Sequence, residues 1–133
     1  MASQFSCLGP DDGDPLHAAR ALFAPIATAS FEVAAFAYLD PEWRLLGMRH
    51  VRSNRCDAVM IPVRAVVADA LAFDCVAVVM AHNHPSGDPS PSAADFALTR
   101  RLARGLDLVE VRLVEHLILA RDGCESFRAQ GLL

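Results

Sequence analysis

The pattern of hydrophobic and polar positions along the chain predicts helices and strands in alternation. Residues 14–27 begin with Asp-Pro, which is typical of a helix start, and then carry apolar residues on one helical face. Residues 31–39, FEVAAFAYL, are apolar at both alternating positions apart from Glu32, which indicates a strand covered on both sides. The turn residues at 40–42 separate this strand from a second one at 43–51, so we expect a β-hairpin.

The middle of the chain continues the alternation. A short strand is expected at residues 58–61, and apolar residues at helical spacing follow over residues 63–71. Residues 75–81, CVAVVMA, form a short, continuous and valine-rich run, which predicts a central strand of a sheet. After a loop rich in proline, glycine and serine, Ser92 is typical of a helix N-cap, and Asp95 occupies the third position of that helix.

The C-terminal part of the chain completes the predicted fold. Two strands are expected at residues 108–114 and 117–120, paired with each other, and residues 126–133 close the domain. The length suits one domain, and the interleaved elements predict an α/β (α+β) fold with a mixed central sheet. We expect this domain to span residues 14–133, and the small, polar and acidic residues 1–13 to form a flexible lead-in.

Charge and composition disfavour several classes of protein. The formal net charge is −4 and all 12 basic residues are arginine, whereas an electrostatic nucleic-acid binder usually carries a basic excess. The one arginine cluster, Arg100, Arg101 and Arg104, has the spacing of an exposed helix face. No apolar stretch approaches the roughly 20 residues of a membrane helix. The first residues show no export signal, so we expect a cytoplasmic protein without a membrane segment.

Two histidines and an aspartate surround the loop after the predicted central strand. Residues two apart in an extended segment point the same way, so His82 and His84 are expected to converge at the end of that strand. Prolines and Gly87 stiffen and turn the loop, and the next helix presents Asp95 in its first turn. These are the three protein ligands of a catalytic zinc site, which keeps a fourth position open. Capping of the helix alone would also explain Asp95.

Glu32 and Ser92 are candidates for the chemistry beside such a metal. Glu32 is the one charge in its predicted strand, and an isolated carboxylate is costly to bury. It is therefore expected either to accept a proton beside the metal or to reach solvent at the end of the sheet. Ser92 is expected either to cap its helix or to donate a hydrogen bond to an oxyanion formed on a substrate carbonyl.

These residues also resemble a known motif. His82-X-His84, seven residues, Ser92, two residues and Asp95, with a glutamate on an early strand, resemble the JAMM motif of the MPN (Mov34/JAB) metallopeptidase-like domains. The segment AHNHPSG, the following PS..D and the closing VEHLILARDGCESFRAQGLL are similar to the RadC-like branch of that family. The resemblance spans residues 31–133.

The resemblance implies a fold, a cofactor and an activity. The fold would be a mixed, curved β-sheet flanked by helices, a cytidine-deaminase-like architecture. One zinc ion per chain would be bound by His82, His84 and Asp95. Glu32 would activate water, and Ser92 would help to stabilise the tetrahedral intermediate. JAMM enzymes cleave peptide or isopeptide bonds, including those between ubiquitin-like modifiers and lysine, so the expected partner is a peptide or protein substrate.

A second reading is a non-catalytic MPN-fold binding module linked to DNA repair or DNA processing. RadC-like proteins were named for DNA repair, but their full-length form carries a helix-hairpin-helix segment, and only about thirty residues precede Phe31 here. Together with the acidic charge, this leads us to expect no direct DNA binding. Asn83 stands where eukaryotic deubiquitinases usually have Ser or Thr. His116 is expected either to orient a ligand or the substrate or, as the preferred alternative, to make a structural hydrogen bond in its strand, and it is placed outside the site. A homodimer is compatible with the small domain.

Overall fold

A mixed β-sheet forms the centre of the computed structural model, which describes residues 21–52 and 62–133. Within these residues the sheet has five strands in the order β2-β1-β3-β4-β5. The strands are β1 (Val33–Leu39), β2 (Leu45–Arg52), β3 (Ala77–Asn83), β4 (Arg112–Ala120) and β5 (Gly123–Ser126). Only β3 and β4 are parallel, and the other neighbours are antiparallel.

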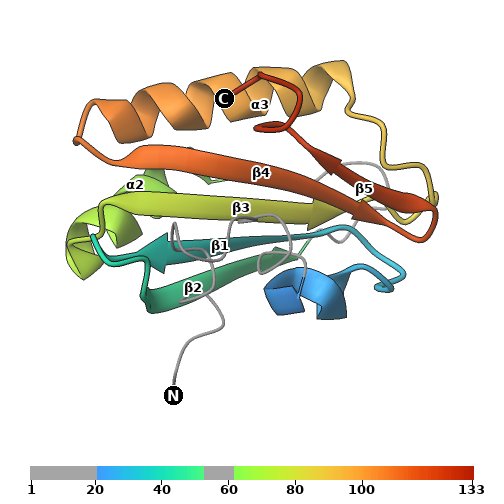
Figure 1. The fold of residues 1–133 in the computed structure, drawn as a ribbon, viewed down its shortest axis with the longest axis horizontal. Coiled ribbons are helices and arrows are strands. Elements are labelled where there is room, and N and C mark those ends of the chain that lie inside the picture. Colours follow the sequence, from blue (N-terminus) through green and yellow to red (C-terminus); the bar gives the residue numbers. More distant parts are fainter. Residues whose placement is uncertain (1–20, 53–61) are drawn as a thin grey trace.

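Two helices cover one face of this sheet. They are α2 (Val63–Phe73), which precedes β3, and α3 (Ala93–Asp107), which connects β3 to the parallel strand β4 and runs alongside β4 in Figure 1. A parallel pair needs such a crossover because the chain must return to the same end of the sheet. The short 3-10 helix η3 (Ala24–Ile26) packs on the other face.

Alternate residues of the strands point into two separate hydrophobic cores. The core on the helical side contains Ala34, Phe36, Tyr38, Val78, Met80 and Leu113 from the strands, with Val66, Ala70, Leu102 and Leu106 from the helices. The opposite core contains Ala35, Ala37, Leu39, Ala77, Val79, Ala81, Val114, Leu117 and Leu119, with Phe23 and Ile26. By this alternation His82 lies on the helical side of β3, and Asn83 lies on the opposite side.

The predicted fold class is confirmed: the structure is a single mixed α+β domain with a sheet flanked by helices. The hairpin of β1 and β2 is confirmed, as is the helix α2. The central strand β3 begins and ends two residues later than predicted, so that it includes His82. Residues 21–23 are helical, as predicted, and continue into η3. The rest of the predicted first helix, the lead-in and the strand at 58–61 lie outside the described residues.

The prediction of two paired strands at residues 108–114 and 117–120 is wrong. Residues 108–110 form a turn, and β4 is one continuous strand that pairs with β3 on one side and with β5 on the other. The gap between the two predicted strands falls at Glu115 and His116, whose side chains are both buried and hydrogen-bonded within the fold. Because their polar atoms have partners inside the protein, the strand continues through them.

Candidate metal centre

Three elements meet at one end of the sheet. The end of β3, the first turn of α3 and the start of β1 lie together on the right of Figure 1. His82 is the sixth residue of β3 and pairs with Ala34 of β1, and His84 follows immediately after the strand. The backbone N–H of His84 donates to the carbonyl of Leu119 in β4 at 2.9 Å, so the first loop residue is still fixed to the sheet.

The predicted ligands His82, His84 and Asp95 are brought together by this arrangement. The Nε2 atoms of the two imidazoles lie 3.0 Å apart. One carboxylate oxygen of Asp95 lies 3.2 Å from Nε2 of His82, and the other lies 3.2 Å from Nε2 of His84. The three side chains converge as the sequence predicts. His82 and His84 are two residues apart in an extended segment, and the loop brings the first turn of α3, with Asp95, back to them.

These separations fit the ligand shell of a zinc ion. Zinc bonds to imidazole nitrogen and carboxylate oxygen at 2.0–2.1 Å, so two ligand atoms in a tetrahedral shell are about 3.3 Å apart. The contacts of 3.0–3.2 Å among His82, His84 and Asp95 are close to this value. Imidazole donors favour zinc and other transition metals over magnesium or calcium.

Glu32 lies beside this triad. Its side chain is buried, and one of its oxygens lies 4.0 Å from Nε2 of His82. Ligand atoms of Glu32, His82 and His84 all lie within 4.8 Å of one another, which is a second set able to hold a metal ion. The residue precedes β1 by one position instead of lying inside the strand, and it does not reach solvent at the end of the sheet.

Ser92 and Asp95 form a capping box at the start of α3. The hydroxyl of Ser92 accepts from the backbone N–H of Asp95 at 3.1 Å, and the Asp95 carboxylate accepts from the backbone N–H of Ser92 at 2.8 Å. Capping and metal binding are therefore compatible roles for Asp95. Burial alone would raise the pKa of Asp95, but hydrogen bonds from His82 and His84 hold that pKa well below its usual range.

The loop between His84 and Ser92 fixes the orientation of the His84 ring. Nδ1 of His84 lies 2.9 Å from the carbonyl of Asp88, which can only accept, so Nδ1 carries a proton and Nε2 is the atom that would offer a lone pair to a metal ion. Gly87 makes the turn with a φ of 95°, a conformation that favours glycine. The hydrogen bond to Asp95 raises the pKa of His84 in the metal-free protein.

A third histidine contacts the site from β4. Nε2 of His116 lies 2.7 Å from Nδ1 of His82, and Nδ1 of His116 lies 2.7 Å from the hydroxyl of Thr99 in α3. His116 is fully buried, and burial holds its pKa well below the usual range, so the ring is neutral. His116 thus makes hydrogen bonds within the fold, as expected, and one of them joins its ring directly to the candidate ligand His82.

The chain matches a known protein family over most of its length. The profile of the RadC-like JAB domain matches residues 13–132. The chain belongs to this family. The resemblance to the RadC-like branch, which the motif indicated, is therefore confirmed.

Relatives of this RadC-like JAB domain include UPF0758 proteins from several bacteria. The protein from Alcanivorax borkumensis is 39% identical over 118 residues, which cover 89% of this chain and 53% of the relative. The protein from Methylibium petroleiphilum is 41% identical over 108 residues, which cover 81% of this chain and 49% of the relative. The chain thus spans about half the length of these curated relatives.

Two contributors to the RadC-like site were not predicted from the sequence. Thr99 lies one helical turn after Asp95 on α3. This spacing places both residues on one helix face, so the sequence alone could have indicated that Thr99 lies near the site. Asn83 is the second contributor, because its side chain contacts the backbone on both sides of Glu32. Nothing in the local pattern of β3 indicated that contact, because the two segments are 50 residues apart.

Proposed function

We propose that this RadC-like JAB domain is a zinc-dependent hydrolase of the JAMM type that cleaves peptide or isopeptide bonds. The observation that carries the proposal is the convergence of His82, His84 and Asp95 at 3.0–3.2 Å with a buried Glu32 beside them. Zinc would be held by the two Nε2 atoms and the Asp95 carboxylate. When bound, it would supply Lewis acidity that polarises a carbonyl and acidifies water.

The proposed role of Glu32 is to accept the proton of the attacking water and pass it to the leaving amine. One of its oxygens is 4.0 Å from Nε2 of His82, longer than the 3.0–3.2 Å contacts of the triad, which supports a place beside the ligands instead of among them. A carboxylate can act as general base and then as general acid when it lies within reach of both reacting groups. Its burial keeps it away from bulk water.

The proposed role of Ser92 is to donate a hydrogen bond through its hydroxyl proton, which the helix cap does not use. In the cap, Ser92 Oγ acts as an acceptor for the N–H of Asp95. Its own proton remains available for donation, and the residue is exposed at the mouth of the site. Through this proton, the hydroxyl would donate a hydrogen bond to the oxyanion that develops on a substrate carbonyl.

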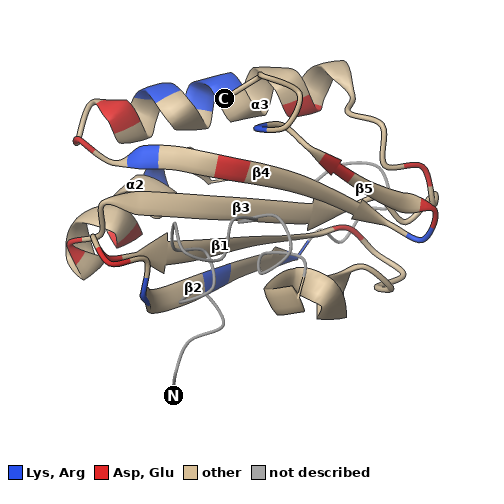
Figure 2. Ribbon diagram, in the orientation of Figure 1, with Lys and Arg blue, Asp and Glu red and all other residues tan. Residues whose placement is uncertain are grey.

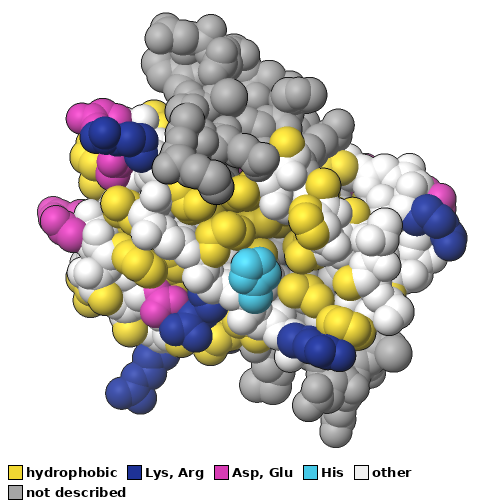
Figure 3. Space-filling view, turned by 90° about the horizontal axis from the view of Figure 1, so that it is seen from below, with side chains coloured by type: hydrophobic (Ala, Val, Ile, Leu, Met, Phe, Trp, Pro, Cys, Tyr) yellow, Lys and Arg dark blue, Asp and Glu magenta, His cyan; other side chains and the backbone are white. Residues whose placement is uncertain are grey.

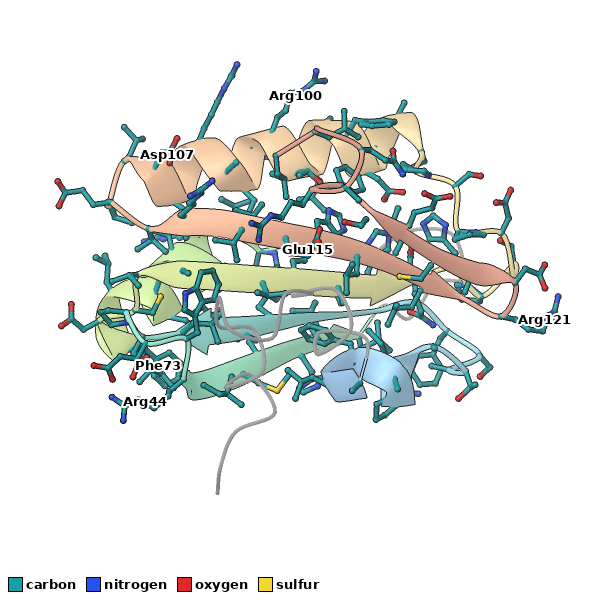
Figure 4. All side chains as sticks on the ribbon, viewed as in Figure 1. Arg44, Phe73, Arg100, Asp107, Glu115 and Arg121 are labelled. Atoms are coloured by element: carbon teal, nitrogen blue, oxygen red, sulfur yellow. The ribbon has the colours of Figure 1, made fainter. Side chains whose placement is uncertain are left out.

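The surface charge supports a peptide or protein substrate over nucleic acid. Arg100, Arg101 and Arg104 are exposed on α3, and Arg100 extends away from the sheet in Figure 4. Acidic residues, among them Asp107, lie on the same helix, and Figure 2 shows both signs interspersed over the fold. Figure 3 shows hydrophobic side chains with scattered charges, and the described residues on this face form no basic stripe. Phosphate binding normally requires such a basic stripe.

The metal is tested first, by elemental analysis of the purified protein. We expect about one zinc per chain in the wild type and almost none in the double variant His82→Ala/His84→Ala. His50→Ala is the matched control, because His50 is exposed on β2 and should leave the zinc content unchanged. A double variant that retains the full zinc content would contradict the assigned ligands.

The hydrolase is tested with Glu32→Gln, which keeps the size of the side chain but removes the base. Internally quenched peptides and lysine isopeptides provide the substrates. We expect Glu32→Gln to bind zinc like the wild type and to lose turnover by about 10²–10⁴-fold. Glu110→Gln, at an exposed turn after α3, is the control and should retain full turnover. Unchanged turnover in Glu32→Gln would refute the assigned base, and a zinc-loaded wild type inactive on every substrate would favour a binding module.

A further inference from the structure

We propose that His116 is a positioning residue that fixes the tautomer of His82, and that Thr99 closes a hydrogen-bonded circuit between the two ligands His82 and Asp95. The inference rests on the metal site of the proposed function. It assigns a role to two buried side chains that touch neither the substrate nor the metal.

The circuit runs through four residues on three elements. From His82 in β3 it passes to Nε2 of His116 in β4 at 2.7 Å, and from Nδ1 of His116 to the Thr99 hydroxyl at 2.7 Å. The Thr99 hydroxyl then reaches the backbone carbonyl of Asp95 at 2.7 Å within α3. The Asp95 carboxylate lies 3.2 Å from Nε2 of His82, so a metal ion shared by these two ligands would complete the circuit.

The direction of the protons follows from the Thr99 hydroxyl. A hydroxyl has one proton, and the Asp95 carbonyl can only accept, so Thr99 donates to that carbonyl. The same hydroxyl must then accept from Nδ1 of His116, and Nε2 of His116 is left with a lone pair. That lone pair accepts from Nδ1 of His82, so in the neutral imidazole that binds a metal Nε2 of His82 is unprotonated and faces the candidate metal position.

The opposite direction is incompatible with metal binding. It would place the proton of His82 on Nε2, the atom that lies 3.0 Å from Nε2 of His84 and 3.2 Å from Asp95. It would also leave the Thr99 oxygen and the Asp95 carbonyl, 2.7 Å apart, with no proton between them. The circuit therefore selects the tautomer of His82 that can bind a metal.

The two histidine ligands reach the same tautomer by different means. His84 donates from Nδ1 to the backbone carbonyl of Asp88, which is a usual partner for a metal-binding histidine. His82 is buried inside the sheet, and the structure offers its Nδ1 a second imidazole in that place. The His116 ring is itself held by Phe127, which stacks on it with centroids 4.4 Å apart and planes 16° apart.

The test compares zinc affinity in His116→Phe and His116→Gln, measured by competition with a chromophoric chelator. His116→Phe keeps a ring against Phe127 but leaves Nδ1 of His82 without an acceptor, so we expect about 10–100-fold weaker zinc binding. His116→Gln supplies an amide oxygen as acceptor and should restore a large part of the loss. His50→Gln, on exposed β2, is the matched control and should bind zinc like the wild type.

Two further measurements keep the test decisive. Thr99→Val removes the hydroxyl at nearly constant volume, and it should weaken zinc binding even if His116→Phe does not fold by circular dichroism. In zinc-loaded wild type, long-range ¹H–¹⁵N spectra should place the protons of His82 and His116 on Nδ1. A proton on Nε2 of His116 would overturn the proposal. A zinc affinity within twofold of the wild type in folded His116→Phe would also overturn the proposal. If His116→Phe does not fold, the same result in Thr99→Val would overturn it. A wild type that binds no zinc would instead contradict the proposed function itself.

Discussion

The side-chain oxygen of Asn83 accepts a 2.6 Å hydrogen bond from the backbone N–H of Val33, the residue that follows Glu32. The amide nitrogen of the same side chain donates to the carbonyls of Phe31 at 3.0 Å and Ala29 at 3.2 Å. The residue between the two histidines therefore holds the backbone on both sides of Glu32. The end of β3 thus positions the candidate ligand His82 on one face of the sheet, and Asn83 on the other face positions the backbone of the proposed base Glu32.

Replacing Asn83 by alanine tests this relationship. The change removes three buried hydrogen bonds, so we expect a loss of about 2–4 kcal/mol in the free energy of unfolding. Zinc affinity should change little, because the Asn83 side chain contacts the backbone of residues 29–33 and, by the alternation along β3, the His82 side chain lies on the opposite face. Turnover should fall clearly, because Glu32 is no longer held. Chemical unfolding, zinc competition and peptide hydrolysis measure the three effects, and wild-type turnover in a folded variant would contradict the positioning of Glu32.

Ser92 allows the helix cap to be separated from catalysis. Alanine at an N-cap costs about 1 kcal/mol of stability, whereas glycine costs only a few tenths. Both variants lack the hydroxyl, so both should lose turnover to a similar extent, about 10²–10³-fold, while they retain zinc. Thermal melts and hydrolysis rates measured side by side distinguish the two roles. If Ser92→Gly kept the turnover of the wild type, Ser92 would serve the helix alone.

The ligand geometry could be predicted from the sequence because it depends on local rules. The spacing of His82 and His84 follows from the two-residue period of extended backbone, and Asp95 follows from the first turn of a capped helix. Both rules operate over a few residues. The prediction of the three converging side chains tolerated an error of about two residues in where the central strand ends and the helix starts.

The sequence left two roles open for His116 and gave no sign of the contacts that Asn83 makes. His116 reaches His82 only because β4 pairs in parallel with β3 in a register that places His116 opposite Met80. Asn83 reaches residues 29–33 only because β1 lies next to β3. Both contacts depend on strand order and register, which the hydrophobic pattern does not specify. The same limit explains the error at β4, where buried partners of Glu115 came from β5 and the chain end.

A second polar network lies on the helical side, away from the candidate metal centre. Asp69 of α2 accepts from the hydroxyl of Tyr38 in β1 at 2.8 Å and from Nη2 of Arg49 in β2 at 2.8 Å. It therefore ties α2 to two strands. The hydrogen bond from Arg49 is the largest influence that lowers the pKa of Asp69, and burial followed by the contact with Asp69 raises the pKa of Tyr38.

In the variant Asp69→Asn, the free energy of unfolding should depend less on pH in the acidic range than in the wild type. A carboxyl whose folded pKa is lowered stabilises the fold fully above its unfolded value of about 3.9, and this contribution is lost as the pH falls through the folded pKa. At neutral pH we expect Asp69→Asn to cost about 1–2 kcal/mol, a modest figure because Arg49 is partly exposed to screening solvent. The gap to wild type should be constant from pH 5 to 8 and should narrow below pH 4. Urea unfolding across this range measures it, with the exposed Asp107→Asn as control. A gap that widens on acidification would show that the Asp69 carboxylate does not stabilise the fold.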